Sequence, residues 1–382
     1  MRVAGIMSGT SLDGIDVAVV DIDGRGWNKR VKVRAFRTAP YSGEVRAAIL
    51  SVSNAAAHTS QLARLHFLLG ELYADAVKTT CRRAGLALDS LGLIASHGQT
   101  VYHEGEPVRF LGRRIASTLQ LGEAAVIAER TGLPVVSDFR PRDIAAGGRG
   151  APLAPYVDYL LFRHRRRGRI ALNIGGIANI TALPAAGKPR DVIAFDTGPG
   201  NMVVDALVQE STRGKLKYDR GGRLAARGRV HVSLLDEILR EPFYYREPPK
   251  TAGREQYGRE FVGRMLATGL PLEDLIATAT ALTAAAVAEG VARFVRPRMR
   301  VDDLIVSGGG AHNRQMLGYL GAFLPDLAIA TSADFGVNID AKEAIAFAVL
   351  GYETWRRRPA NLPSATGARR PVVLGKLTPE NR

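Results

Sequence analysis

An apolar strand, a tip of small residues and a second apolar strand open this chain, and the same pattern returns near its middle. The first copy has its tip at residues 8–16, and the second has its tip around Gly175-Gly176, within residues 173–179. Two strands joined by so short a tip pair as an antiparallel β-hairpin. Strand and helix patterns alternate after each hairpin. The repetition therefore predicts an α/β chain made of two related halves.

The first tip is a candidate phosphate cradle, with an ordinary tight turn as the alternative. Glycines let a backbone approach a ligand closely, and inward-facing N–H groups bind anions. The tip is not a Walker A loop, because Ile15-Asp16 stands where Lys-Ser/Thr is required. Nor is it a nucleophile elbow, because Asp13 occupies the second glycine position of that motif.

Length and composition set broad limits. The chain has 382 residues, of which 46% are hydrophobic, and this suffices for two domains or one large domain with a substantial core. Cys81 is the single cysteine, so a disulfide scaffold and a cysteine zinc site are excluded. Because Ser, Gly and Asp interrupt residues 1–20, we expect no signal peptide, no membrane span and a cytoplasmic protein.

The formal net charge of +15 raises the question of a nucleic-acid partner. The basic groups at residues 163–169, 356–358 and 369–370 lie at predicted element ends or in linkers and contain no interleaved aromatic residues. We therefore expect solvated surface there, and neither nucleic acid nor membrane as a partner. The same charge would steer an anionic substrate such as ATP.

A third glycine-rich turn, at residues 307–313, follows a strand and opens a helix. Two hairpins and such a turn, in this order, resemble the actin/hexokinase/Hsp70 type of fold, in which two lobes surround a central cleft for ATP and sugar. We place the first lobe at residues 1–145 plus 346–382 and the second at 146–345, and the basic segment 163–169 marks where the second pattern starts. Met7-Ser8 stands where many members carry a metal-positioning Asp, so the metal ligands stay unknown.

Two carboxylates are candidate catalytic groups. Asp196 ends an apolar strand and precedes a Gly198-Pro199-Gly200 turn and a helix, so it projects where α/β proteins bind ligands. There it could accept a proton from water or a hydroxyl, and the alternative is a residue that only caps the helix. Glu343 lies in a helix of small apolar residues, where a carboxylate is costly to bury unless it is paired or used. A surface glutamate is the alternative there.

Polar motifs elsewhere could bind the substrate. His97 and Gln99 follow a short buried strand, and we expect them to hydrogen-bond a sugar because no metal-site spacing surrounds the histidine. Arg140 precedes a glycine-rich stretch, residues 147–152, and could hold an acidic substrate. An Arg–Asp ion-pair loop is the alternative for this segment.

Taken together, the motifs resemble the anhydro-N-acetylmuramic acid kinase family over nearly the whole chain. The matching segments are residues 7–16, 96–100, 138–140, 147–152, 173–179, 195–201, 250–255 and 307–313. The resemblance implies an enzyme that uses ATP, Mg²⁺ and water to open 1,6-anhydro-N-acetylmuramic acid and phosphorylate its O6. The product is N-acetylmuramic acid 6-phosphate, and the reaction belongs to peptidoglycan recycling.

The resemblance also implies roles for individual residues. Asp196 would be the catalytic base, and Glu343 would be a second active-site carboxylate. The residues implied to bind ATP are Gly9, Thr10, Ser11, Leu12, Asp13, Gly14, Ile15, Asp16, Asn173, Gly175, Gly176, Gly308, Gly309, Gly310 and Asn313. The residues expected to bind the sugar are His97, Gln99, Arg140, Gly198, Pro199 and Gly200.

Two other functions remain open at this stage. A kinase of the same fold acting on another amino sugar would phosphorylate an ordinary hydroxyl without opening a ring. A non-catalytic sensor of sugar or nucleotide would bind without turnover. The expected partners are small molecules, namely ATP, the anhydro sugar and water, and a homodimer is left open as the assembly state.

Overall fold

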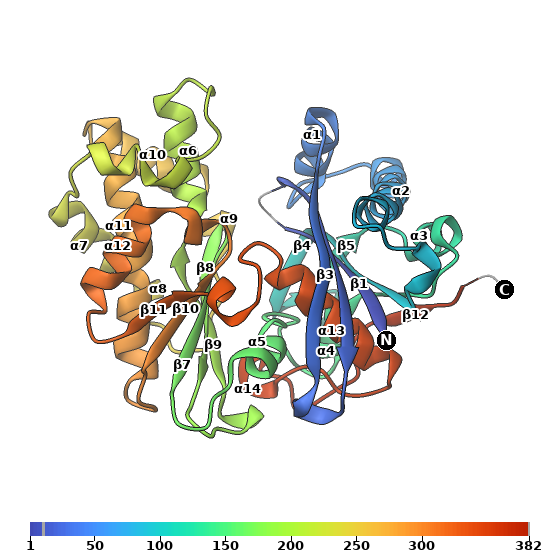
Figure 1. Ribbon diagram of the computed structural model, residues 1–382. Helices are drawn as coiled ribbons and strands as arrows, with labels where there is room; N and C mark the ends of the chain where they lie inside the picture. The colour runs from blue at the N-terminus through green and yellow to red at the C-terminus, as the bar shows by residue number, and fades with distance from the viewer. Residues whose placement is uncertain (10–11, 381–382) are drawn as a thin grey trace. The chain divides into compact units, whose positions relative to one another are not determined.

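The computed structural model describes residues 1–9 and 12–380. The chain divides into two compact units (Figure 1). The first unit comprises Met1–Leu160 and Ala341–Arg382, and the second comprises Leu161–Asp340. Each unit is built around its own sheet, so the predicted α/β class with two related halves is confirmed.

The first unit contains a seven-stranded mixed sheet in the order β12-β6-β4-β1-β2-β3, with β5 paired to β4. The hairpin of β1 and β2 is antiparallel, as is the pair β2 and β3, whereas β4 runs parallel to β1 and β6 parallel to β4. The strands are β1 (Arg2–Ser8), β2 (Gly14–Asp23), β3 (Arg30–Pro40), β4 (Leu93–Phe110), β5 (Arg113–Leu121), β6 (Val135–Ser137) and β12 (Lys376–Thr378).

The second unit repeats this arrangement in a five-stranded sheet of order β11-β10-β7-β8-β9. Its hairpin, β7 and β8, is antiparallel, β9 extends it antiparallel, and β10 and β11 follow in parallel on the other side. The strands are β7 (Arg169–Ile174), β8 (Ile177–Leu183), β9 (Ile193–Pro199), β10 (Asp303–Ser307) and β11 (Ala328–Thr331). Both units therefore place a central strand between its hairpin partner and a parallel neighbour, the order of ribonuclease H-like lobes.

Helices cover the sheets of both units. Helix α13 packs on β1 and β4, and Figure 1 shows it beside the blue hairpin although it comes from the far end of the chain. In the first unit the helices are α1 (Gly43–Val52), α2 (Thr59–Arg83), α3 (Ala124–Thr131), α4 (Phe139–Ala145), α5 (Pro155–Phe162), α13 (Lys342–Trp355) and α14 (Pro363–Thr366). In the second they are α6 (Asn201–Ser211), α7 (Val232–Leu239), α8 (Pro242–Tyr245), α9 (Arg254–Tyr257), α10 (Arg259–Ala267), α11 (Leu272–Gly290) and α12 (Arg314–Phe323).

Helix α11 is the central helix of the second unit. It packs against α6, α12 and β9 and buries residues on every side, from Leu275 to Gly290. Together with the π-helical segment Val291–Val295 that follows, Leu272–Val295 is long and apolar enough to cross a membrane by length and composition, yet 83% of its apolar stretch is buried inside the protein. This helix therefore fills a core.

The limits of the units differ from those predicted. Residues 146–160 and 341–345, which the sequence assigned to the second half, belong to the first unit. One cause is the buried Asp143 carboxylate, which accepts hydrogen bonds from Gly150 N at 2.9 Å, Asn361 Nδ2 at 2.6 Å and Thr366 Oγ1 at 2.8 Å. The glycine-rich segment 147–152 is thus tied to the C-terminal part of the chain, although its composition is typical of a linker.

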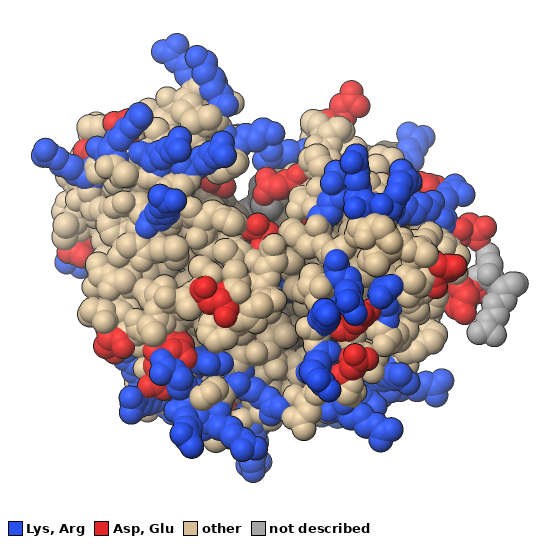
Figure 2. All heavy atoms as spheres, in the orientation of Figure 1, with Lys and Arg blue, Asp and Glu red and all other residues tan. Residues whose placement is uncertain are grey.

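The basic side chains form no single surface patch in the view of Figure 2. Lys and Arg lie there in several separate groups, interrupted by uncharged surface and by acidic side chains. In the predicted basic segment, Arg167 and Arg169 both pair with Asp303, and the hydrogen bond from Arg167 keeps the pKa of Asp303 below its usual value. Part of this segment is therefore an ion-pair network at the start of β7.

Candidate active site

The tip of the first hairpin is held by a buried polar cluster. Ser8, at the end of β1, lies 2.7 Å by its Oγ from Tyr41 Oη and donates to Gln99 Oε1 at 2.5 Å. The Gln99 amide in turn donates to the carbonyl of Gly9 at 3.4 Å. Ser8 and Gln99 are each only 1% exposed. Gln99 was predicted to bind sugar. Its side-chain oxygen and nitrogen are hydrogen-bonded to Ser8 and Gly9, where β1 leads into the tip.

The remaining predicted tip residues fall into different environments. Leu12 and Ile15 are buried in the hydrophobic core of the first unit, whereas Asp13 is exposed. Gly14 is a close-packed position, because a Cβ there would lie 2.4 Å from the carbonyl oxygen of Ala39 on β3. Asp16 accepts a hydrogen bond from Thr38 Oγ1 at 2.5 Å. Thr10 and Ser11 lie outside the described residues.

The buried His97 and the half-buried Arg140 form a hydrogen-bonded pair on the first unit. The Arg140 guanidinium donates through Nε to His97 Nε2 at 3.0 Å and through Nη1 to the carbonyl of Gly150 at 3.0 Å. The His97 ring also stacks on Phe347, with ring centroids 4.5 Å apart. Because an arginine can only donate, His97 Nε2 is an acceptor and the neutral ring carries its proton on Nδ1. Burial, aided by the charge of Arg140, holds the pKa of His97 well below its ordinary value.

Glu343 lies in the first turn of α13, beside a buried ion pair. Its neighbour Lys342 donates to Asp158 Oδ1 on α5 at 3.1 Å, and both of these side chains are about 3% exposed. Burial raises the pKa of Glu343, and the positive charges of Lys342 and Arg140 partly oppose that rise. His97, Arg140 and Glu343, predicted from three distant segments, thus belong to one region of the first unit.

In the second unit, the tip of the hairpin is joined to the start of α6. The backbone N–H of Gly200 donates to the carbonyl of Gly176 at 2.9 Å, and the N–H of Asn201 donates to the carbonyl of Gly175 at 2.8 Å. A Cβ on Gly200 would lie 2.3 Å from that Gly175 oxygen. The Gly198-Pro199-Gly200 turn is therefore close-packed against the tip, and the first N–H group of α6, that of Asn201, is already paired.

The third glycine turn meets the same hairpin. Gly308 has a φ of +80°, and a Cβ there would lie 2.7 Å from the carbonyl of Ile174 and 2.9 Å from Asn173 Oδ1. A Cβ on Gly310 would meet the Ile174 side chain at 2.3 Å. Asn313 caps α12, since its Oδ1 accepts from the N–H groups of Gln315 and Met316, each at 3.1 Å. Asn173, Gly175, Gly176, Gly200 and Gly308–Gly310 are thus brought together.

Asp196 lies on β9 and is oriented by a segment that is distant in sequence. Its backbone N–H donates to the carbonyl of Lys250 at 3.0 Å, and its carboxylate Oδ2 accepts from the N–H of Ala252 at 2.8 Å. The side chain is partly exposed. One carboxylate oxygen is therefore fixed by the backbone, an arrangement that positions a proton acceptor.

Lys250 is a residue of this site whose surroundings the sequence does not reveal. It is 2% exposed, and its Nζ lies 4.6 Å from the ring centroid of Phe243, 4.7 Å from that of Phe294 and 5.6 Å from that of Phe195. The ammonium also donates to the carbonyl of Phe243 at 3.0 Å. Burial lowers the pKa of Lys250 to about 8, although the charge of Asp196 favours the protonated form. The local sequence Lys-Thr-Ala-Gly does not predict that three phenylalanine rings surround the lysine.

No group of three or more His, Cys, Asp or Glu side chains that could hold a metal ion occurs among the described residues. A protein-only metal cage is therefore absent from residues 1–9 and 12–380. A divalent cation carried by substrate phosphates needs only one or two protein carboxylates. Two carboxylates lie near the tip of the first hairpin, the exposed Asp13 and the partly exposed Asp16.

Comparisons with known proteins give consistent results. The sequence model of one family, described as "Anhydro-N-acetylmuramic acid kinase", matches residues 1–380. A relative of that name from Caldanaerobacter subterraneus subsp. tengcongensis is 46% identical over 381 residues, covering 98% of this chain and 96% of its own. Another of that name, from Bacillus cereus strain Q1, is 44% identical over 385 residues, covering 99% of each chain.

Solved structures are similar to this chain at much lower identity. A ROK family glucokinase from Streptomyces griseus, in complex with glucose and AMPPNP, is 13% identical with a TM-score of 0.41, covering 92% of this chain and 100% of its own. A similarity of this size supports no statement about the site.

Proposed function

The chain belongs to the anhydro-N-acetylmuramic acid kinase family, and from that premise we propose which of its residues carry out the reaction. The family activity is that of an ATP-dependent kinase acting on anhydro-N-acetylmuramic acid in peptidoglycan recycling. The proposal concerns the catalytic base, the phosphate-binding turns, the sugar contacts and the cation. Its main support is Asp196: its carboxylate accepts one hydrogen bond from the N–H of Ala252, and its backbone N–H donates another to the carbonyl of Lys250.

Asp196 acts as the base that activates water. With Oδ2 held by the N–H of Ala252, the carboxylate accepts a proton from a water that attacks the anomeric carbon of the anhydro sugar. The bond between C1 and the bridging oxygen breaks, and its electron pair stays on that oxygen, which is O6. O6 then attacks the γ-phosphorus of ATP, and the bond to ADP breaks. One base suffices, because the phosphoryl acceptor replaces the general acid of ordinary glycosidases.

The glycine turns bind ATP. In the first unit the binding groups are the backbone N–H groups of residues 9–16, on a tip that Ser8 and Gln99 hold in place. In the second unit the Gly175-Gly176 tip and the Gly308–Gly310 turn lie together and leave no room for a Cβ at Gly308 or Gly310. Because Ile174 and Asn173 fill that space, Gly308 and Gly310 allow the turn to pack tightly, and we assign the exposed backbone of Gly309 to contact with a flat base or a phosphate. Asn173 and Asn313 support this turn through Ser307 and through α12.

The sugar contacts on the first unit are Arg140 and Glu343. His97 and Gln99 are 3% and 1% exposed, so we assign them to positioning: His97 accepts from Arg140, and Gln99 holds Ser8. The raised pKa of Glu343 suits a group that hydrogen-bonds sugar in either protonation state. In the second unit, the Gly198-Pro199-Gly200 turn adjoins the proposed base and lies along the sugar.

Mg²⁺ accompanies ATP and neutralises charge on its phosphates when it is bound. A cation held chiefly by ATP phosphates and water needs only one or two protein carboxylates. Asp13 and Asp16 are the carboxylates at the first hairpin that could complete its coordination. We place the protein in the cytoplasm, where ATP is available and the buried Cys81 stays reduced.

The reaction is tested with ATP, Mg²⁺ and 1,6-anhydro-N-acetylmuramic acid in ¹⁸O-labelled water, followed by mass spectrometry of the product. We expect one phosphate and one ¹⁸O at the anomeric carbon for each ADP formed. A product without ¹⁸O would rule out ring opening by water. ADP formed only with another amino sugar would favour the neighbouring kinase activity, and binding without turnover would favour a sensor.

The base is tested with Asp196→Asn, which keeps the shape of the side chain but removes its basicity. We expect turnover to fall by at least about 10³-fold while ATP binding changes little, because general-base catalysis contributes on this scale. Asp191→Asn, at an exposed position just before β9, is the control with the same charge change. Turnover in Asp196→Asn close to that of Asp191→Asn would exclude Asp196 as the base.

A further inference from the structure

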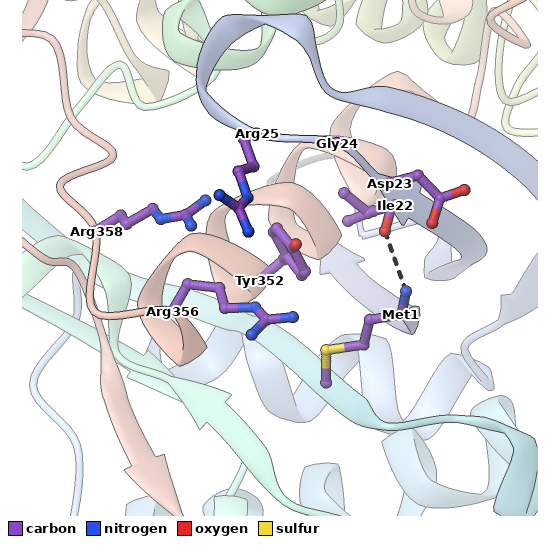
Figure 3. A pocket seen from close by; sticks show the side chains of 8 residues that line it. All are labelled: Met1, Ile22, Asp23, Gly24, Arg25, Tyr352, Arg356 and Arg358. Carbon is purple, nitrogen blue, oxygen red and sulfur yellow. Dashed lines mark hydrogen bonds between the residues drawn. The ribbon is translucent and has the colours of Figure 1, made fainter.

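A cavity of about 370 Å³ opens at the edge of the first unit, away from every residue assigned above. Its wall combines three short segments: Met1 at the start of β1, Arg25 just after β2, and Tyr352, Arg356 and Arg358 at the end of α13 and beyond it (Figure 3). The Met1 ammonium donates to the carbonyl of Ile22 at 3.1 Å. This volume lies within the range of small-molecule pockets.

The charged side chains around this cavity are mostly positive. Three arginines line it, against a single carboxylate, Asp23. In Figure 3 the guanidinium groups of Arg25 and Arg358 point toward one another, whereas the Asp23 carboxylate points away from them. Three like charges around one hollow repel each other unless an anion enters.

The nearby carboxylates do not neutralise these arginines. Asp21 pairs with Arg2 and Arg34, and Glu353 pairs with Lys29 at 2.7 Å, with both of those side chains 1% exposed. Within the described residues, Arg25, Arg356 and Arg358 form no salt bridge, whereas Arg130, Arg264 and Arg296 each pair with a carboxylate. Arg356 instead lies over the Tyr352 ring at 5.5 Å.

Arg358 gives a second, independent indication. Its Nη1 is shielded from solvent and has no hydrogen-bond partner among the described residues. A buried charged donor without a partner is costly, and it is rare in native proteins. An anion in the cavity would supply the missing acceptor with a small movement of the planar guanidinium.

We propose that this cavity is a binding site for a phosphate group, either free or carried by a small metabolite. Planar guanidinium groups bind phosphate oxygens in pairs, and three of them match an anion with at least two charges. The site is separate from the ATP-binding tip, because Met1 and Arg25 lie at the opposite end of the first hairpin. The ten residues of β2 place the two ends about 33 Å apart.

A bound phosphate would link two elements that otherwise end separately at this edge. Arg25 follows the hairpin, and Arg356 and Arg358 follow α13, whose first turn carries Glu343. The anion would therefore stabilise the folded first unit and raise its unfolding temperature. The inference does not depend on which sugar the enzyme phosphorylates.

The site is tested by isothermal titration calorimetry and thermal unfolding with inorganic phosphate, pyrophosphate and glucose 6-phosphate, at an ionic strength kept constant with chloride. The wild type is compared with the double variant Arg25→Gln/Arg356→Gln, whose two side chains are exposed and can be changed without disturbing the core. The matched control is Arg357→Gln/Arg370→Gln, which removes two charges from exposed positions of the same unit outside the cavity.

We expect the double variant to bind the preferred anion at least about tenfold more weakly than wild type and control, because charge-assisted hydrogen bonds are lost. Its KM for ATP should stay unchanged, which separates this site from the ATP site. The preferred probe tells whether the ligand is free phosphate, pyrophosphate or a sugar phosphate. Equal binding by all three proteins, equal weakening in the control, or no binding even at about 10 mM would overturn the proposal.

Discussion

At the scale of single residues, Lys250 links stability to the proposed base. Its backbone carbonyl accepts from Asp196 N, while its ammonium lies among three phenylalanine rings and donates to the Phe243 carbonyl. Cation–π contacts and hydrogen bonds offset part of the cost of burying this charge. The lowered pKa of about 8 shows that the offset is incomplete.

This lysine predicts a pH dependence of stability. Between pH 8 and about 10.5 the unfolded chain keeps the Lys250 proton while the folded protein loses it, so the free energy of unfolding rises with pH in this window. We expect wild type to gain up to about 3 kcal/mol relative to Lys250→Met across this range. Urea unfolding of both proteins at pH 7.5 and 10.5 measures this gain. If the difference in free energy of unfolding between the two proteins were the same at both pH values, the lowered pKa of Lys250 would be contradicted.

Lys250→Met should also affect turnover. The carbonyl of Phe243 loses its donor, and the segment that orients Asp196 becomes looser. We expect kcat to fall about tenfold, the effect of a modest misplacement of a catalytic group, with little change in KM for ATP. Lys217→Met, at an exposed position of the same unit, is the control for a lost lysine charge.

The neutral His97 ring predicts a pH dependence of stability in the acidic range, whereas Lys250 predicts one in the alkaline range. Its folded pKa is well below 6.5, so the unfolded chain takes up a proton that the folded protein refuses, and stability falls as the pH drops below about 6.5. We therefore expect the free energy of unfolding of the wild type, relative to that of His97→Gln, to be lower at pH 5 than at pH 7.5. Nitrogen NMR should show a neutral ring protonated on Nδ1 at pH 5, and a ring that titrates near pH 6.5 would refute this.

At the scale of elements, close backbone approach explains several glycines better than direct ligand contact does. Gly14 leaves room for β3, and Gly200 leaves room for the tip of the second hairpin. These positions were predicted to bind ATP or sugar from their place in motifs. The structure adds that each also permits two elements to meet, so a substitution there changes the shape of the site as well as its chemistry.

Gly200→Ala tests this contact. The new Cβ would lie 2.3 Å from the Gly175 carbonyl oxygen, so α6 must move away from the hairpin tip. We expect a loss of roughly 1–3 kcal/mol or more in the free energy of unfolding, together with a raised KM for ATP. Gly263→Ala in α10 is the control, since its Cβ would meet nothing within 4 Å and should stabilise the helix by about 0.5–1 kcal/mol. Equal stability of the two variants would argue against the close contact.

At the scale of the whole molecule, the first unit is assembled from both ends of the chain. Helix α13 supplies buried residues such as Ile345 and Phe347, and a Cβ on Gly5 of β1 would lie 2.0 Å from the Ala344 carbonyl. The sheet of residues 1–160 therefore cannot bury one of its faces without residues 341–382. The second unit is continuous and has its own core around α11.

This organisation predicts how fragments behave. Residues 161–340 should fold alone and unfold cooperatively, whereas residues 1–160 should not, because α13 is missing from their core. A fusion of 1–160 to 341–382 through a short Gly/Ser linker should restore folding, since Asp158 and Lys342 lie 3.1 Å apart. Thermal unfolding followed by circular dichroism measures all three. A cooperative transition in residues 1–160 alone would show that the helix is dispensable.

The fold class, both hairpins and the position of Asp196 at a strand end could be predicted, because they depend on local patterns. These patterns are apolar alternation, glycine tips and a strand followed by a turn. Each extends over about ten residues, so it can be recognised in the sequence. The family followed from the order of such motifs. The domain limits were less accurate, because Asp143 binds partners more than two hundred residues away, and composition does not report such contacts.

The environment of each side chain was settled only when distant segments met. His97 and Gln99 are polar residues after a strand, yet α4, α13 and the first hairpin enclose them and turn their polar atoms inward. Lys250 is buried because β9, α8 and the π-helical segment Val291–Val295 bring three aromatic rings around it. The hairpins depend on residues that are close in sequence. The burial of a side chain and the charges around it depend on all the segments that pack against it, and these segments meet only in the folded chain.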